Sequence, residues 1–128
     1  SWTLYETIYG SGDASNAGIV FQVAATPEMT VHAGAGLKVA PSLALGVPGV
    51  LTEHHNGASS RVALNNGAYA TGNIGTTSPG GVTIGASDAG VDPANIKFYG
   101  MIMRGGTMSD IEIAAARLWA AKRAGVTL

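Results

Sequence analysis

The sequence predicts an all-β sandwich that ends in one short helix. Short stretches that alternate apolar and polar residues recur along the chain, and turn residues separate them at intervals of about 8 to 12 residues, as in β-sandwiches. Nineteen of the 128 residues are glycine, roughly twice the usual share of about 7%, which fits many tight turns. The one clear helix signature lies near the C-terminus.

The expected strands are brief, as sandwich strands tend to be. Residues 2–9, WTLYETIY, alternate most strongly, and the pair Asn56-Gly57 favours a type I′ hairpin turn between two later strands. Asn65-Asn66-Gly67 predicts a further turn. The full set of expected strands is 2–9, 19–24, 29–33, 37–40, 50–55, 60–64, 69–73, 82–86 and 96–103.

The C-terminal end predicts a strand, a turn and a capped helix. Residues 96–103, IKFYGMIM, are rich in β-formers, and Gly105-Gly106 ends them. Ser109 and Glu112 then have the spacing of a capping box, and Gly125 fits a left-handed C-terminal cap. We therefore expect a helix between Ser109 and Gly125.

The apolar face of this helix is expected to pack across the sandwich. Its stripe has the i, i+4, i+7 spacing of one helical face and consists of Ile111, Ala115, Leu118 and Lys122, with Ala114, Ala121 and the edge of Trp119 beside it. By helix and strand phase, Trp119 and Phe98 are also expected in the core.

Composition limits the classes of function. The length predicts one domain, residues 1–128. Seven basic and eight acidic residues give no electrostatic case for nucleic acid or an anionic membrane surface, and no apolar run has the length of a membrane span. Without cysteine, disulfides and thiolate metal sites are excluded. Charged residues are only 12%, which favours a surface covered by neighbouring chains.

The end of the chain resembles a known family. The residues that carry the resemblance are Tyr99 to Gly105, Ser109 to Ile113, Leu118-Trp119 and Lys122 to Leu128. They resemble the end of concanavalin A-like (laminin G-like) jelly-roll domains, a version of which is common at the C-termini of bacteriophage virion proteins. Upstream, residues 2–8, Asn56-Gly57 and 82–86 are similar to the family's central strand, hairpin and later strand. The family contains sugar binders, glucanases and structural modules, so the resemblance implies a fold more than a function.

The resemblance implies a concanavalin A-like jelly roll in a virion. Family members carry additional strands before the segment that residues 2–8 resemble, so we expect a sandwich truncated at its N-terminal side. An incomplete sheet has an unpaired edge, and we expect other copies of the chain or another virion protein to cover it. A trimer would suit the three-fold positions of an icosahedral shell.

No catalytic constellation is found. His54 and His55 are adjacent on a strand and point to opposite faces, so they cannot share one metal. Glu53 beside His54 is a weak acid–base candidate. Glucanase carboxylates at alternating strand positions, a nucleophile elbow, a P-loop and a dinucleotide fingerprint are all missing. We therefore expect a protein that is not an enzyme, with no cofactor and no metal.

Calcium is the one ion considered. Its candidate ligands lie in two polar loops and are Asp13, Asn16, Asp88, Asp92 and Asn95. Hard cations need about six to eight oxygens, and turn formation explains these residues better.

Sugar binding is the alternative function, in the form of a module that recognises host-surface glycans. It needs an aromatic ring to stack on the sugar. The candidate glycan or interface contacts outside the C-terminal motif are Trp2, Tyr5, Tyr9 and Tyr69. Packing in the core or at a subunit interface is favoured for them.

Overall fold

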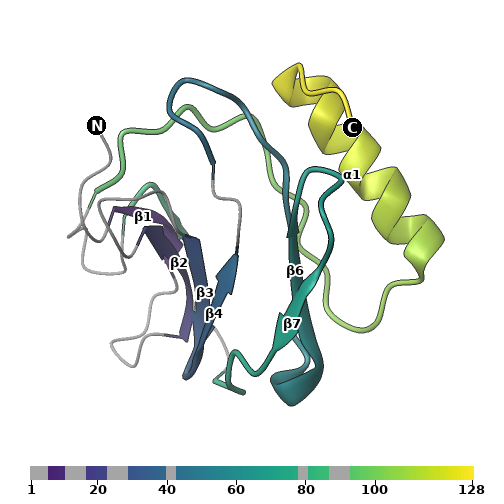
Figure 1. Cartoon of the computed structure of the whole chain (residues 1–128). Coiled ribbons are helices and arrows are strands. Elements are labelled where there is room, and N and C mark those ends of the chain that lie inside the picture. Colours follow the sequence, from purple (N-terminus) through teal and green to yellow (C-terminus); the bar gives the residue numbers. More distant parts are fainter. Residues whose placement is uncertain (1–5, 11–16, 23–28, 40–42, 78–80, 87–92) are drawn as a thin grey trace.

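Two antiparallel sheets and one C-terminal helix make up the part of the chain that the computed structural model describes, residues 6–10, 17–22, 29–39, 43–77, 81–86 and 93–128 (Figure 1). The five-stranded sheet has the order β4-β3-β2-β1-β8, with β1 (Thr7–Gly10), β2 (Ala17–Gln22), β3 (Met29–Ala33), β4 (Gly36–Val39) and β8 (Thr83–Ile84). The three-stranded sheet is a meander of β5 (Leu51–His54), β6 (Ser60–Leu64) and β7 (Ala70–Gly72). The predicted β-rich class with one C-terminal helix is thus confirmed.

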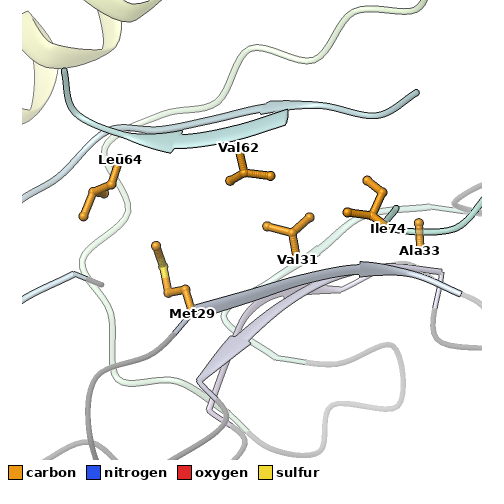
Figure 2. Close-up of a cluster of buried hydrophobic side chains, with 6 residues drawn as sticks. All are labelled: Met29, Val31, Ala33, Val62, Leu64 and Ile74. Carbon is orange, nitrogen blue, oxygen red and sulfur yellow. The ribbon is translucent and has the colours of Figure 1, made fainter. Parts of the chain in front are cut away.

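The core lies between the two sheets. Its buried members come from β3 and β6 and from the segment after β7: Met29, Val31, Ala33, Val62, Leu64 and Ile74. Figure 2 shows the side chains of β3 and β6 pointing toward one another across this layer. Alternation explains which residues of β3 and β6 belong to this core, because every second residue of each strand faces the opposite sheet.

The segment that follows β7 of the small sheet is hydrogen-bonded to the large sheet. The carbonyl oxygen of Ile74 accepts hydrogen bonds from the backbone N–H of Ala33 at 2.6 Å and of Ala35 at 2.9 Å, and the N–H of Thr77 donates to the carbonyl of Ala33 at 3.0 Å. Gly75 lies between these contacts with a φ of 94°. The turn between β3 and β4 therefore connects the two sheets.

Helix α1 (Asp110–Ala124) lies beside the small sheet, on the side away from the large one (Figure 1). Two contacts hold it there. The Arg61 guanidinium of β6 binds the Asp110 carboxylate at 3.0 Å, and that of Arg117 donates to the Asn66 amide oxygen at 3.1 Å. Within the described ranges, no helix is long and apolar enough to cross a bilayer.

Both predicted ends of α1 are confirmed. The Ser109 hydroxyl accepts from the N–H of Glu112, and the Glu112 carboxylate accepts from the N–H of Ser109, which completes the capping box. At the other end Gly125 adopts the left-handed conformation with φ 70°, and the N–H of Val126 donates to the carbonyl of Ala121. These signals are local, so the sequence alone specifies them.

The predicted apolar face of α1 is wrong except at Ala121, which is buried as expected. Ile111 is 83% exposed and Leu118 is 62% exposed, whereas the buried residues of the helix are Ile113, Ala121 and Ala124. The helix is apolar on two sides, and the side with the smaller residues is the one turned inward. The contacts of Arg61 with Asp110 and of Arg117 with Asn66 are consistent with this orientation.

The predicted strand at 96–103 is also wrong. These residues form no strand, and Phe98 is 46% exposed rather than in the core. The segment runs alongside α1: the ring of Trp119 lies against Gly100, and the Arg104 guanidinium binds Glu112 at 2.6 Å. Trp119 itself is 40% exposed. Alternation predicts β-geometry, but a strand also needs a neighbouring strand to pair with.

The connection at Asn56-Gly57 is not the predicted type I′ turn. A 3₁₀ turn (Gly57–Ser59) joins β5 to β6, and Asn56 has a φ of −149° where type I′ needs a positive value. The buried hydroxyl of Ser60 explains the difference, because it accepts from the N–H of Asn56 and donates to the carbonyl of Gly57, both at 2.8 Å. The predicted turn at Asn65-Asn66-Gly67 is present, with a hydrogen bond from Gly67 to Leu64.

Candidate functional site

Tyr9, Glu53 and His55 form a polar cluster where the two sheets meet. Tyr9 belongs to β1 of the large sheet, and Glu53 to β5 of the small one. The Tyr9 hydroxyl donates to Glu53 Oε2 at 2.5 Å, and His55 Nε2 lies 2.9 Å from the same oxygen. Tyr9 and Glu53, which this contact joins, are 44 positions apart in the sequence.

Burial determines the electrostatics of this cluster. The Glu53 side chain is only 12% exposed, and Tyr9 packs against the core. Burial raises the pKa of the Tyr9 phenol far above its ordinary value of 10, and the neighbouring Glu53 carboxylate raises it further through its charge and its hydrogen bond. Tyr9 therefore stays protonated and is a hydrogen-bond donor, not a base, at neutral pH.

The cluster corrects the pairing expected for Glu53. The sequence nominated His54 as its partner, but the partners are Tyr9 and His55. Leu51 packs against the core, and alternation places Glu53 and His55 on the same side of β5 as Leu51, with His54 on the other. That signal was present in the sequence, whereas the contact with Tyr9 required the fold.

The chemistry of the cluster is hydrogen bonding between the sheets. The contacts of Glu53 are hydrogen bonds, one to the protonated Tyr9 phenol of the large sheet and one to the His55 imidazole beside β5. We therefore describe the cluster as a polar clamp between sheets and assign no reaction to it.

Of the four nominated aromatic residues, Tyr9 and Tyr69 lie in the described part of the chain, and each contacts another side chain. Trp2 and Tyr5 lie outside the described residues. The Tyr9 hydroxyl is bound to Glu53, and the ring of Tyr69 lies under the Arg61 guanidinium, 4.9 Å from its centroid. Arg61 also binds Asp110, so the Tyr69 ring packs under the side chain that connects β6 and α1.

The calcium candidates are mostly beyond the described ranges. Asp13, Asn16, Asp88 and Asp92 fall outside them, while Asn95 is described and exposed. Among the residues whose placement is given, no group of three or more His, Cys, Asp or Glu side chains could hold a metal ion.

A second feature is an apolar surface at the C-terminal end, to which Phe98, Trp119 and the expected inward face of α1 contribute although they were predicted to be buried. Its large side chains are between 36% and 83% exposed: Phe98, Tyr99, Met101, Ile102, Met103, Ile111, Leu118 and Trp119. They come from the segment 96–103 and from the adjoining helix α1, which Gly100 and Trp119 bring into contact.

Acidic and basic side chains lie at opposite ends of α1, the helix that carries part of this apolar surface. Asp110 and Glu112 lie in the first turn of α1, and Lys122 and Arg123 lie in its last turn. Arg104 holds the pKa of Glu112 near 2, below its ordinary 4.5, mainly through their hydrogen bond, and Ser109 contributes through its backbone and side-chain bonds. Arg123 stacks over the Trp119 ring at 4.6 Å. The helix is negative at its start and positive at its end.

Together, the fold and these sites define a two-sheet antiparallel β-protein with an inter-sheet polar clamp and an apolar C-terminal surface. No family model, curated protein or solved structure matches the chain.

Proposed function

We propose that the chain is a non-enzymatic structural protein of a bacteriophage virion, which decorates or cements the capsid or forms part of the tail. In this proposal its two sheets are those of a concanavalin A-like jelly roll. It assembles with copies of itself and with other virion proteins.

The C-terminal apolar surface is the observation that carries the proposal. Large exposed apolar patches mark sites of protein association, and here eight large side chains from adjoining segments are exposed. The low charge content of 12% supports the same role, because a chain covered by neighbours needs few charges for solubility. The virion setting is supported by the family resemblance of the C-terminal residues.

Light scattering coupled to size-exclusion chromatography tests the proposal. The isolated 128-residue chain, 12.8 kDa, is expected to elute as an oligomer at micromolar concentration. A monomer at every concentration up to the solubility limit would contradict self-assembly and with it the structural role as proposed here.

Glycan binding is the second candidate function. The observation that favours it is the exposure of three aromatic rings, Phe98, Tyr99 and Trp119, since exposed rings can stack on a sugar. Glycan arrays probed with the wild-type chain and with Tyr99→Ala distinguish the structural role from glycan binding. Selective binding that Tyr99→Ala abolishes, without a change in oligomeric mass, would favour the sugar-binding module.

A further inference from the structure

Helix α1 presents to solvent a stripe that is well suited to contact itself. We define the outer stripe as Ile111, Ala115, Leu118 and Lys122; all four are exposed, and the two largest apolar members are exposed by 83% and 62%. We propose that the outer stripe pairs antiparallel with the outer stripe of a second copy of this chain, so that the copies are related by a two-fold axis.

The spacing of the stripe is the same read in either direction. Its members follow one another at intervals of four, three and four residues. Reversal about the middle of the helix places Ile111 against Lys122 of the second copy, and Ala115 against Leu118 of the second copy. Large residues then meet small or flexible ones, which is the self-complementary arrangement that an isologous interface requires.

The charges favour the antiparallel orientation. In this register Asp110 lies opposite Arg123 of the second copy, so the acidic first turn of each helix meets the basic last turn of the other. In a parallel pair, like charges would meet at both ends. Asp110 remains accessible for this contact although it binds Arg61, because its side chain is 88% exposed.

The available area fits a stable dimer. At about 200 Å² for each fully exposed large side chain, the C-terminal apolar surface offers roughly 800 Å², which is the area one partner contributes to a standard interface. A typical monomer has a largest apolar patch of about 300–600 Å². Because the segment 96–103 contacts α1 at Gly100 and Trp119, it extends the stripe on one side.

This inference rests on the proposed structural role, since it names the surface and the partner through which the chain assembles. It differs from the expected association at the N-terminal edge. A two-fold contact also gives a dimer, whereas a three-fold position would need a trimer.

Cysteine cross-linking tests the register directly, because the chain has no cysteine of its own. Ile111→Cys mixed with Lys122→Cys is expected to form an intermolecular disulfide under mild oxidation. Ile111→Cys alone is not, since in the antiparallel register the two copies of position 111 lie 11 residues apart along the axis, about 16 Å, and a disulfide needs Cα atoms within roughly 7 Å. Cross-linking of Ile111→Cys with itself would overturn the antiparallel pairing.

Light scattering on charge-introducing variants supplies the second test. Ile111→Lys is expected to weaken association at least about tenfold, because in this register it places a second ammonium group against Lys122 of the other copy. The matched control is Leu45→Lys, since Leu45 is exposed by 56% on a loop outside the stripe, and the oligomeric mass of this variant should equal that of wild type. Circular dichroism checks that both variants are folded.

The outcomes separate the two proposals. A wild-type dimer that Ile111→Lys dissociates supports both. A trimer, or any oligomer that Ile111→Lys leaves intact, overturns the helix pairing and leaves the structural role standing. A monomer at all concentrations overturns both.

Discussion

Ile111 and Ile113 lie on opposite sides of α1 and have opposite environments, with 83% and 8% of their surfaces exposed. The same residue type, two positions apart, is thus a surface residue and a buried one. This pair fixes the rotation of the helix about its axis, and it leaves the outer stripe available for contact.

The first prediction compares these two isoleucines. Ile113→Ala is expected to lower the free energy of unfolding by about 2–4 kcal/mol at any protein concentration, because it removes buried methyl groups. Ile111→Ala should have an effect only at concentrations where the chain associates, because its side chain makes its contacts with the second copy. Urea unfolding at several concentrations measures both. Equal losses at high dilution would contradict the assigned helix face.

The second prediction concerns the polar clamp. Tyr9→Phe removes the phenol that donates to Glu53 and leaves the carboxylate with less compensation, so unfolding should become easier by about 1–3 kcal/mol. Tyr69→Phe is the matched control, because it keeps the ring under Arg61, and it should change stability by less than about 0.5 kcal/mol. If the two variants are equally stable, the clamp does not hold the sheets together.

The third prediction concerns Gly75, where the chain crosses between the sheets. A Cβ there would overlap the Ala33 carbonyl oxygen, and φ is 94°. Gly75→Ala should therefore destabilise the protein by about 3 kcal/mol or more, through overlap and backbone strain together. Gly105→Ala meets no atom within 4 Å and should stay within about 0.5 kcal/mol of wild type. Thermal unfolding of the two variants measures both losses of stability. A loss for Gly75→Ala as small as that for Gly105→Ala would contradict the described path of the backbone between the sheets.

The fourth prediction is a dependence on pH that comes from Glu112. Its pKa is about 2 in the folded chain against an ordinary 4.5, so the unfolded chain binds more protons between these values. The stability that ionised Glu112 provides is therefore present above pH 4.5 and is lost as the pH falls toward 2. Urea midpoints measured at several pH values should fall more steeply for wild type than for Glu112→Gln.

Glu112→Gln is an informative comparison because glutamine can still complete a capping box but cannot form the ion pair with Arg104. Parallel pH profiles for the two proteins would mean that the Arg104–Glu112 pair does not stabilise the helix.

The parts of the fold that the sequence predicted well are those set by nearby residues. The bounds of β3 and β6 agree with the expected 29–33 and 60–64, because clear alternation is flanked by turn residues there. The capping box of α1 is equally local. Both depend on residues within a few positions of one another.

The parts that failed depend on what packs against a segment. The pattern at 96–103 fits a strand, yet the segment runs along α1, with the Trp119 ring against Gly100. The helix is apolar on both sides, so periodicity could not choose between Ile111 and Ile113. The Tyr9–Glu53 contact joins residues 44 apart, and no local rule relates them.

Methionine oxidation tests the central claim, that the C-terminal apolar surface is covered by another protein chain when the protein assembles. Met103 is 60% exposed and Met29 is fully buried in the core, so the chain contains its own control. Peroxide treatment followed by mass spectrometry gives the rate of sulfoxide formation at each of the two methionines. The rates are measured at low and at high protein concentration. We predict that Met103 oxidises more slowly at high concentration while Met29 stays protected throughout. Oxidation of Met103 at one unchanged rate, in a sample that light scattering finds to be associated, would contradict the claim.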